Sequence, residues 1–314
     1  MPKLSNQNII KGRGAVDAYR AAHAQLHSAK WHKGLPEEHT PLLNTMLSEL
    51  KKQGFNSIDE FFKIEHQFVL TQGVLNLAGK EIRLIDMSAE SYFDFLALIE
   101  AERNLMVSKQ IPNTLTMFNP ERYWITTGYN LEDSNEYVDL IKAKGLDVKL
   151  IINAPGKGTA IIGRGSVACV LTLKAGLQEL TDAYAQRFFT EILRGLGITG
   201  TSLDGNDILV GGKKIIGMSN LNSETVSALR AIIALDFPYD LAHIIKSRAD
   251  KIPAKDRVIT ARSILGKEVT TADLKRAFQI AVTTVFNTTL VIQTPSELEL
   301  NLISKGRDRY ISDE

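Results

Sequence analysis

Two stretches of the chain carry residues whose types and spacing could support chemistry. The first is glycine-rich, with Gly156, Gly158, Gly163 and Gly165 inside ten residues. Glycines let backbone amides approach a phosphate or a carboxylate closely. The stretch is neither a Walker loop nor a dinucleotide fingerprint, because its glycines have a different spacing and lead into an apolar strand. Taken alone, such a stretch is more often a plain turn between strands than an anion site.

The second stretch runs from Asn206 to Gly217 and holds a carboxylate, two lysines and a Gly-Gly pair. The pair Gly211–Gly212 between β-branched runs predicts a two-residue hairpin turn. This hairpin places Asp207 at the entry of one strand and Lys214 at the start of its partner, so both side chains can face one cleft. The carboxylate could hold Mg²⁺, and the ammonium could neutralise a phosphoryl or acyl-phosphate oxygen. A surface hairpin with a charged tip explains the same residues.

Other candidate residues are weaker. His23 and His27 have helical i,i+4 spacing but lack the glutamate of a zinc protease motif, which favours a solvated helix face. Cys169 lies in an apolar run, so we expect a buried hydrophobic residue and not a nucleophile. A single cysteine also excludes an internal disulfide and a thiolate-rich metal site.

The balance of charged residues in the composition indicates which classes of partner to exclude. The 314 residues include 37 Lys plus Arg and 36 Asp plus Glu, giving a net charge of +1. This balance supplies no field that would attract nucleic acid or an anionic membrane. Apolar stretches stay below the roughly 18 residues of a membrane span, and the amino terminus has no apolar core typical of a secretory signal. We therefore expect a soluble protein in a cytoplasmic, ATP-accessible compartment, with no nucleic-acid and no membrane partner.

The chain length favours roughly two domains. Residues 1–80 have helical patterns and predict a helical N-terminal domain of three short helices. The expected helices cover Ala15–Lys30, the segment from Thr40 to near Gly54, and a segment in which Ser57 and Glu60 form a capping box. Residues 81–314 switch to mixed strands and helices and predict a second, α+β domain.

In the second domain the patterns predict a hairpin, further strands and several helices. The expected strands are Glu81–Ile85, a hairpin of Thr114–Phe118 with Tyr123–Thr127, Asp147–Ile152, Val167–Leu173, and Leu290–Gln293. The expected helices are Ser91–Val107, Asn135–Lys144, Leu177–Leu196, Thr225–Leu235, Tyr239–Lys246 and Ala272–Phe286.

The motif Asn206-Asp-Ile-x-Val-x-x-Lys-Lys-Ile-x-Gly217 resembles the signature of the lipoate-protein ligase and biotin-protein ligase superfamily, and most of all the lipoate-protein ligases. The order of elements between Glu81 and Leu290 agrees with the resemblance, which implies an α+β fold of the class II synthetase kind, with mixed and antiparallel sheets flanked by helices. It also implies that Asn206, Asp207 and Gly217 serve the nucleotide, that Asp207 also serves the metal, and that Lys214 contacts acyl and phosphate oxygens.

The resemblance further implies a reaction. A carboxylic acid such as lipoate would be activated by ATP and Mg²⁺ to an acyl-adenylate, and the acyl group would pass to a lysine of a lipoyl-domain-like acceptor protein. The glycine-rich stretch falls at the family's acyl-binding loop, so the residues implied to line the acid are Gly156, Lys157, Gly158 and Thr159.

The chain departs from the family pattern near this loop. Ile152–Asn153 stand where the family has an arginine pair, Ile162–Gly163 stand where it has His-Asp, and Lys157 replaces the middle glycine. Lys157 or Arg164 could restore the missing charge. These departures favour an ATP-independent acyltransferase of the octanoyl or lipoyl type, or a non-catalytic relative that binds an acyl chain or a partner protein. The amide, carboxylate and lysine of the hairpin favour the ligase.

Overall fold

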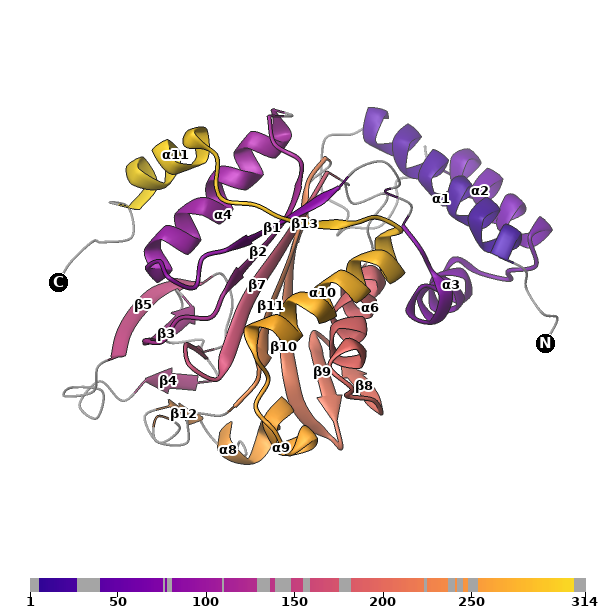
Figure 1. Cartoon of the computed structure of the whole chain (residues 1–314). Coiled ribbons are helices and arrows are strands. Elements are labelled where there is room, and N and C mark those ends of the chain that lie inside the picture. The colour runs from indigo at the N-terminus through magenta and orange to yellow at the C-terminus, as the bar shows by residue number, and fades with distance from the viewer. Residues whose placement is uncertain are drawn as a thin grey trace. The chain divides into compact units, whose positions relative to one another are not determined.

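The computed structural model divides the chain into two compact units, Met1–Gly73 and Val74–Glu314 (Figure 1). The division falls a few residues before the boundary expected from the sequence. The structure describes residues 6–26, 40–75, 77, 81–108, 110–128, 136–138, 148–154, 159–174, 182–222, 225–236, 241, 245–247 and 254–307.

Among its described residues, the first unit has the helices α1 (Asn6–Leu26), α2 (Thr40–Lys52) and α3 (Ile58–Gln72). They enclose a small apolar core of Ile9, Val16, Tyr19, Met46, Leu50, Phe55 and Phe61. α1 starts well before the expected helix at Ala15. Because this core contains residues of all three helices, the unit has its own hydrophobic centre.

Hydrogen bonds at the start of α3 and an ion pair between α1 and α3 stabilise the helices of this unit. The Ser57 hydroxyl accepts the amide of Glu60 at the start of α3, whereas the Glu60 carboxylate accepts the amide of Asn56 at 2.7 Å. The expected capping box is thus only half formed. Arg13 of α1 forms an ion pair with Glu65 of α3, which ties the two helices together.

The second unit is built on an eight-stranded mixed sheet with the order β13-β1-β2-β7-β11-β10-β9-β8. β1 runs parallel to β2 and β13, and the remaining neighbours are antiparallel. Its strands are β1 (Ile82–Asp86), β2 (Asn113–Phe118), β7 (Ser166–Leu173), β8 (Thr201–Asp204), β9 (Asp207–Val210), β10 (Lys213–Asn222), β11 (Ser227–Ala234) and β13 (Leu290–Ile292).

Helices cover both faces of this sheet (Figure 1). α6 (Asp182–Gly195) and α10 (Thr271–Phe286) pack on one face and bury the larger core. α4 (Tyr92–Val107) packs on the other face, and α11 (Glu297–Arg307) lies beside it. Two short helices follow β12, namely α8 (Ala254–Arg257) and α9 (Ala261–Leu265). The expected α+β class with a sheet flanked by helices is confirmed.

The described residues of the unit also form two smaller sheets. One has the order β5-β3-β6, with β3 (Tyr123–Gly128), β5 (Val148–Ala154) and β6 (Thr159–Ile162). The other pairs β4 (Glu136–Val138) with β12 (Ile245–Ser247). Within the described part of the chain, no helix is both long and apolar enough to cross a membrane.

The predicted hairpin of Thr114–Phe118 with Tyr123–Thr127 is wrong. β2 pairs with β1 and β7 in the large sheet, whereas β3 pairs with β5 and β6. Where the chain leaves the large sheet, the Asn119 amide donates to the Ser88 hydroxyl at 3.0 Å. A turn-forming tetrapeptide shows where the chain changes direction, but it does not determine which strands pair.

The predicted helix over Thr225–Leu235 is also wrong. This segment forms β11, between β7 and β10, and Ala228, Leu229 and Ile233 are completely buried. Alanine, leucine and arginine favour a helix locally, but the hydrogen bonds and apolar contacts of a central strand outweigh this preference.

Two further segments predicted as helices contain strands in the structure. Glu136–Val138 and Ile245–Ser247 pair as β4 and β12, which contradicts parts of the helices predicted over Asn135–Lys144 and Tyr239–Lys246. The other residues of these two predictions, apart from Leu241, lie outside the described residues. The predicted helices Ser91–Val107 and Ala272–Phe286 are confirmed as α4 and α10, while α11 has no predicted counterpart.

Candidate functional site

The predicted Gly-Gly hairpin is present between β9 and β10. Val210 pairs with Lys213, so Gly211 and Gly212 form a two-residue loop. Their φ angles are 58° and 75°. A loop with two consecutive positive φ angles matches the twist of an antiparallel ribbon and favours glycine at both positions.

A β-bulge determines which side chains share a face of this hairpin. Lys214 pairs with Leu209, and Gly217 pairs with Asp207, with a register shift between Lys214 and Ile216. In a regular strand Lys214 and Gly217, three residues apart, would point to opposite faces. The extra residue, Ile215, corrects this alternation, so Lys214 shares the face of Asp207.

The bulge is held by burial on the opposite face. Ile208, Ile215 and Ile216 are at most 1% exposed and belong to the core beneath α6 and α10. The apolar side of the hairpin is therefore anchored in the protein, and the polar side faces away from that core.

Asp207 and Lys214 meet on this polar side. The Lys214 Nζ lies 2.8 Å from Asp207 Oδ1, and the two side chains are 41% and 36% exposed, respectively. Gly217 makes room for the lysine: a Cβ on Gly217 would lie 2.7 Å from Lys214 Cε and 2.8 Å from Nζ. The hairpin thus brings together three of the residues that the sequence motif singles out.

Asn206 occupies the exposed turn between β8 and β9. Its carbonyl accepts the amide of Met218 at 2.8 Å, and the preceding Gly205 has a φ of 55°. Gln186 of α6 supports the same turn by donating its side-chain amide to the Gly205 carbonyl at 3.2 Å. This supporting glutamine was missed by sequence reasoning, because it lies on a helix remote in sequence.

The segment after α8 holds the backbone at Lys214. Val258 forms a parallel β-bridge with Lys214, and the Ile259 amide donates to the Lys214 carbonyl at 2.9 Å. Thr260 then caps α9 by accepting the amide of Ser263. In Figure 1, α8 and α9 lie at the end of the sheet where β10 begins.

The same segment connects to the turn at the end of the glycine-rich stretch. The Arg262 amide donates to the Leu235 carbonyl at 2.8 Å, and the Leu235 and Asp236 amides both donate to the Gly165 carbonyl, at 2.9 and 2.7 Å. Arg262 also pairs with Asp236 at 2.7 Å. A continuous series of hydrogen-bonded groups therefore runs from the Gly165 turn to Lys214.

The glycine-rich stretch is described in part. Gly156, Lys157 and Gly158 lie outside the described residues, and Thr159 begins β6. Gly163 has a φ of 152°, and a Cβ there would lie 2.6 Å from the Arg122 carbonyl oxygen. Glycine is thus required by close packing at this turn, which is a structural reason for one of the glycines.

One of the departures from the ligase pattern, Ile162–Gly163, lies at this turn. Ile162 is 1% exposed and packs in the core beside α4, whereas Arg164 is exposed. Ile162 carries no ionisable group. The exposed charge in this turn is therefore the guanidinium of Arg164.

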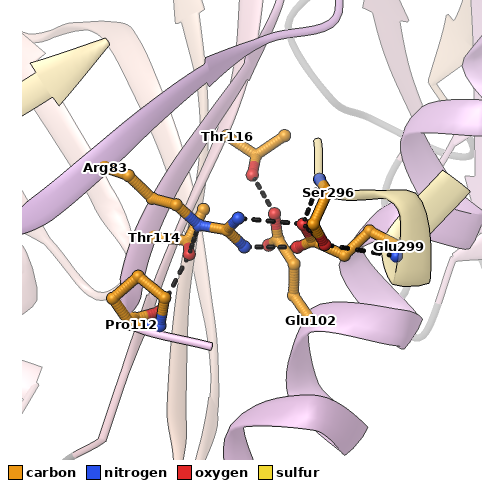
Figure 2. A network of polar contacts seen from close by, with 7 residues as sticks. All are labelled: Arg83, Glu102, Pro112, Thr114, Thr116, Ser296 and Glu299. Atoms are coloured by element: carbon orange, nitrogen blue, oxygen red, sulfur yellow. Dashed lines mark hydrogen bonds and ion pairs between the residues drawn. The ribbon is translucent and has the colours of Figure 1, made fainter. Parts of the chain in front are cut away.

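A buried charge network, which sequence reasoning also missed, lies between the sheet and α4 and α11 (Figure 2). Arg83 of β1 forms an ion pair with Glu299, with one hydrogen bond of 2.8 Å, and donates to Thr114 at 2.7 Å. Glu102 accepts the Thr116 hydroxyl at 2.6 Å. An arginine within an apolar strand was the one available signal for such a network.

The two buried carboxyl groups differ in protonation. Burial raises the pKa of Glu102 to about 8, and the opposing hydrogen bond from Thr116 and charge of Arg83 are weaker. Burial also acts to raise the pKa of Glu299, but hydrogen bonds from Arg83 and Ser296 outweigh it and lower that pKa below its usual value. Each side-chain nitrogen of Arg83 donates a hydrogen bond to Thr114 or Glu299. We therefore assign this network a structural role.

Cys169 is buried in β7, and burial raises the pKa of its thiol to about 12. A thiol that stays protonated and inaccessible is a poor nucleophile. The expected packing role of Cys169 is confirmed.

The described side chains at the hairpin could supply only part of the coordination shell of a metal ion. Among the described residues, no group of three or more His, Cys, Asp or Glu side chains could hold a metal. Asp207 offers a single half-exposed carboxylate. Mg²⁺ commonly binds one or two carboxylates and completes its shell with water and substrate phosphates. The site therefore fits Mg²⁺ that arrives with a phosphate ligand.

Solved lipoate-protein ligases share this fold. A lipoate-protein ligase A bound with ATP matches with a TM-score of 0.61 and 19% identity, over 75% of this chain and 96% of that chain. A bi-partite lipoate protein ligase of Thermoplasma acidophilum, described with its E2 lipoyl domain, matches with 0.60 and 17%, over 77% and 95%. P. falciparum LipL1 in complex with lipoate matches with 0.58 and 16%, over 75% of each.

The chain thus has the fold of the lipoate-protein ligases, as its hairpin motif predicts. No family model and no curated protein matches the chain.

Proposed function

We propose that this protein is a lipoate-protein ligase-like enzyme that activates lipoate, or a related carboxylic acid, with ATP and transfers the acyl group to a lysine of an acceptor protein. The observation that carries the proposal is the Asp207–Lys214 pair, with a separation of 2.8 Å, on a rigid hairpin of the ligase fold. The bulge and Gly217 place the lysine and the carboxylate in contact on one face of the hairpin, where a fixed cation could meet an anionic substrate.

In the first step a carboxylate oxygen of the acid attacks the α-phosphorus of ATP. A new P–O bond forms, the bond between the α-phosphorus and the bridging oxygen breaks, and pyrophosphate leaves with the electron pair. Both reactants are anionic, so a fixed cation lowers their repulsion and stabilises charge in the transition state. Lys214 supplies this cation and holds the acid and the α-phosphate together.

In the second step the amine of the acceptor lysine attacks the acyl carbonyl. An amide bond forms as the bond between the acyl carbon and the phosphate oxygen breaks, AMP leaves with the electron pair, and the proton of the amine passes to solvent. Lys214 again lies beside the leaving phosphate. The acceptor resembles a lipoyl domain, in line with the T. acidophilum ligase described with its E2 lipoyl domain.

The remaining motif residues bind and orient substrates. Asp207 would hold Mg²⁺, which supplies charge neutralisation for the phosphates when bound. Asn206 orients the nucleotide from the exposed turn, and Gly217 leaves space for the lysine. Backbone amides of the stretch Gly156–Thr159 would line the acid, with Lys157 in place of the family's arginines. ATP dependence favours a cytoplasmic location.

The departures from the family pattern support a second candidate. An enzyme that takes a preformed acyl thioester or adenylate would need no ATP, and the apolar, buried Ile162 in place of a family histidine fits such an octanoyl or lipoyl transferase. Pyrophosphate release separates the candidates, because only the ligase produces it.

The direct test compares the two lysines of the hairpin. Lys214→Ala should abolish lipoate-dependent pyrophosphate release, by at least about a hundredfold, because it removes the cation at the reacting phosphate. Lys213→Ala removes an exposed lysine one residue earlier, on the other side of the strand, and should retain activity within about twofold.

Equal activity of Lys214→Ala and the wild-type enzyme would refute the assigned role. Lipoyl transfer without pyrophosphate, in wild-type enzyme given lipoyl thioester, would favour the ATP-independent transferase instead.

A further inference from the structure

The Asp207–Lys214 ion pair has a consequence for how the site accepts a ligand. Within the described part of the chain, Lys214 forms its ion pair with Asp207. The ammonium also lies over Gly217, whose added Cβ would be 2.7 Å from Lys214 Cε and 2.8 Å from Nζ. Before a ligand arrives, the reactive cation is therefore already neutralised by a carboxylate of the same protein.

An incoming carboxylate competes for this cation. Lys214 has three N–H donors, but the one that points at Asp207 is used, and the negative charge of Asp207 repels a second carboxylate at short distance. A ligand anion must share or replace Asp207 as the partner of Lys214. Asp207 therefore weakens binding of the free acid while it remains paired.

The surroundings of the pair permit it to open. Both side chains are partly exposed, and such ion pairs contribute little to stability. The backbone positions are held by the hairpin ladder and by the Ile259–Lys214 hydrogen bond. The head groups can separate without a change in the fold.

We propose that the Asp207–Lys214 pair is a latch: Asp207 occupies Lys214 in the ligand-free protein, and a cation that binds Asp207 together with the nucleotide frees Lys214 for the acid. This inference rests on the proposed function. It adds the prediction that removal of Asp207 has opposite effects on two quantities: the rate of the complete reaction falls, whereas the affinity for the acid alone rises.

The second carboxylate of the same face gives a matched control. Asp204 pairs with Asp207 across β8 and β9, so both side chains lie on one face. Asp204 is exposed, and the ion pair of Lys214 is made to Asp207. Asp204→Asn thus removes the same charge at nearly the same place without opening the latch.

The experiment measures the dissociation constant of lipoate by isothermal titration, without nucleotide and without metal. Asp207→Asn should bind lipoate about two- to fivefold more tightly than wild type, in keeping with the weakness of a partly exposed ion pair. Asp204→Asn should stay within about 1.5-fold of wild type, an estimate for a charge that does not contact the lysine. Circular dichroism checks that each variant is folded.

Two additions test the mechanism of the gain. The double variant Asp207→Asn with Lys214→Ala should bind lipoate as weakly as Lys214→Ala alone, because the gain acts through the lysine. Addition of Mg²⁺ with α,β-methylene-ATP should tighten lipoate binding to wild type but not to Asp207→Asn. Both readouts are binding constants, so neither requires turnover.

An unchanged or weaker affinity of Asp207→Asn, or an equal gain in Asp204→Asn, would overturn the latch and leave the ligase proposal intact. Lipoate binding that is absent from every variant, with or without the nucleotide analogue, would overturn both proposals.

Discussion

At the scale of the residue, the chemistry depends on a lysine and a carboxylate placed on one face by a single extra residue. Lys214 and Gly217 would lie on opposite faces of a regular strand, and the bulge at Ile215 brings them together. Two residues separate the lysine from the glycine in the motif, so these two positions share a face of the strand only because of the bulge.

A second residue-scale feature is Glu102, whose pKa burial raises from 4.5 to about 8. Between these values the folded protein keeps a proton that the unfolded chain has lost. Its contribution to stability is complete below about pH 4.5 and is lost as the pH rises toward 8, at no more than about 1.4 kcal/mol per pH unit. The charge of Arg83 acts to lower this pKa and the charge of Glu299 acts to raise it.

Glu102→Gln cannot ionise but retains the size of the side chain. From about pH 5 to about pH 8, the free energy of unfolding should fall more in the wild type than in this variant. Urea unfolding at both pH values measures the difference. Parallel pH dependence of the two proteins would show that Glu102 does not titrate in this range.

At the scale of the element, the site is positioned by a hairpin and by the segment that crosses its end. The Ile259 amide donates to the Lys214 carbonyl, and the same segment reaches the Gly165 turn through Arg262 and Asp236. The lysine and the turn at the end of the glycine-rich stretch are thus supported by one continuous piece of backbone.

Ile259→Pro removes the amide that donates to Lys214, whereas Ile259→Ala keeps it and shortens the side chain. We expect the proline variant to release pyrophosphate about tenfold more slowly than the alanine variant, because small displacements of a positioning group are costly. Lipoate affinity should change less than the rate. Equal rates in the two variants would contradict a positioning role for this hydrogen bond.

The elements also show which features were predictable. Helical periodicity located α4 and α10, and the Gly-Gly pair located the β9–β10 hairpin, because their signals are local. β11 was predicted as a helix because its strand conformation depends on its two neighbours. The ion pair between Arg83 and Glu299 joins residues 216 positions apart, and no local pattern contains that contact.

At the scale of the whole molecule, the motif predicted a fold that the structure bears out. The residues of the hairpin were predicted to meet, and they do, whereas the bulge, the Gln186 contact and the Ile259 contact required three-dimensional coordinates. The cores of the two units are built from separate parts of the chain, with Ile9–Phe61 in the first and residues from Leu77 onward in the second. All described candidate site residues belong to the second unit.

The role of Lys214 is tested most directly by a crystal structure of the protein with a non-hydrolysable lipoyl-adenylate analogue. We predict that Lys214 Nζ lies within about 3 Å of an oxygen of the group replacing the phosphate, with the ion pair to Asp207 Oδ1 broken. An analogue bound elsewhere, with the Asp207–Lys214 pair intact, would contradict this role.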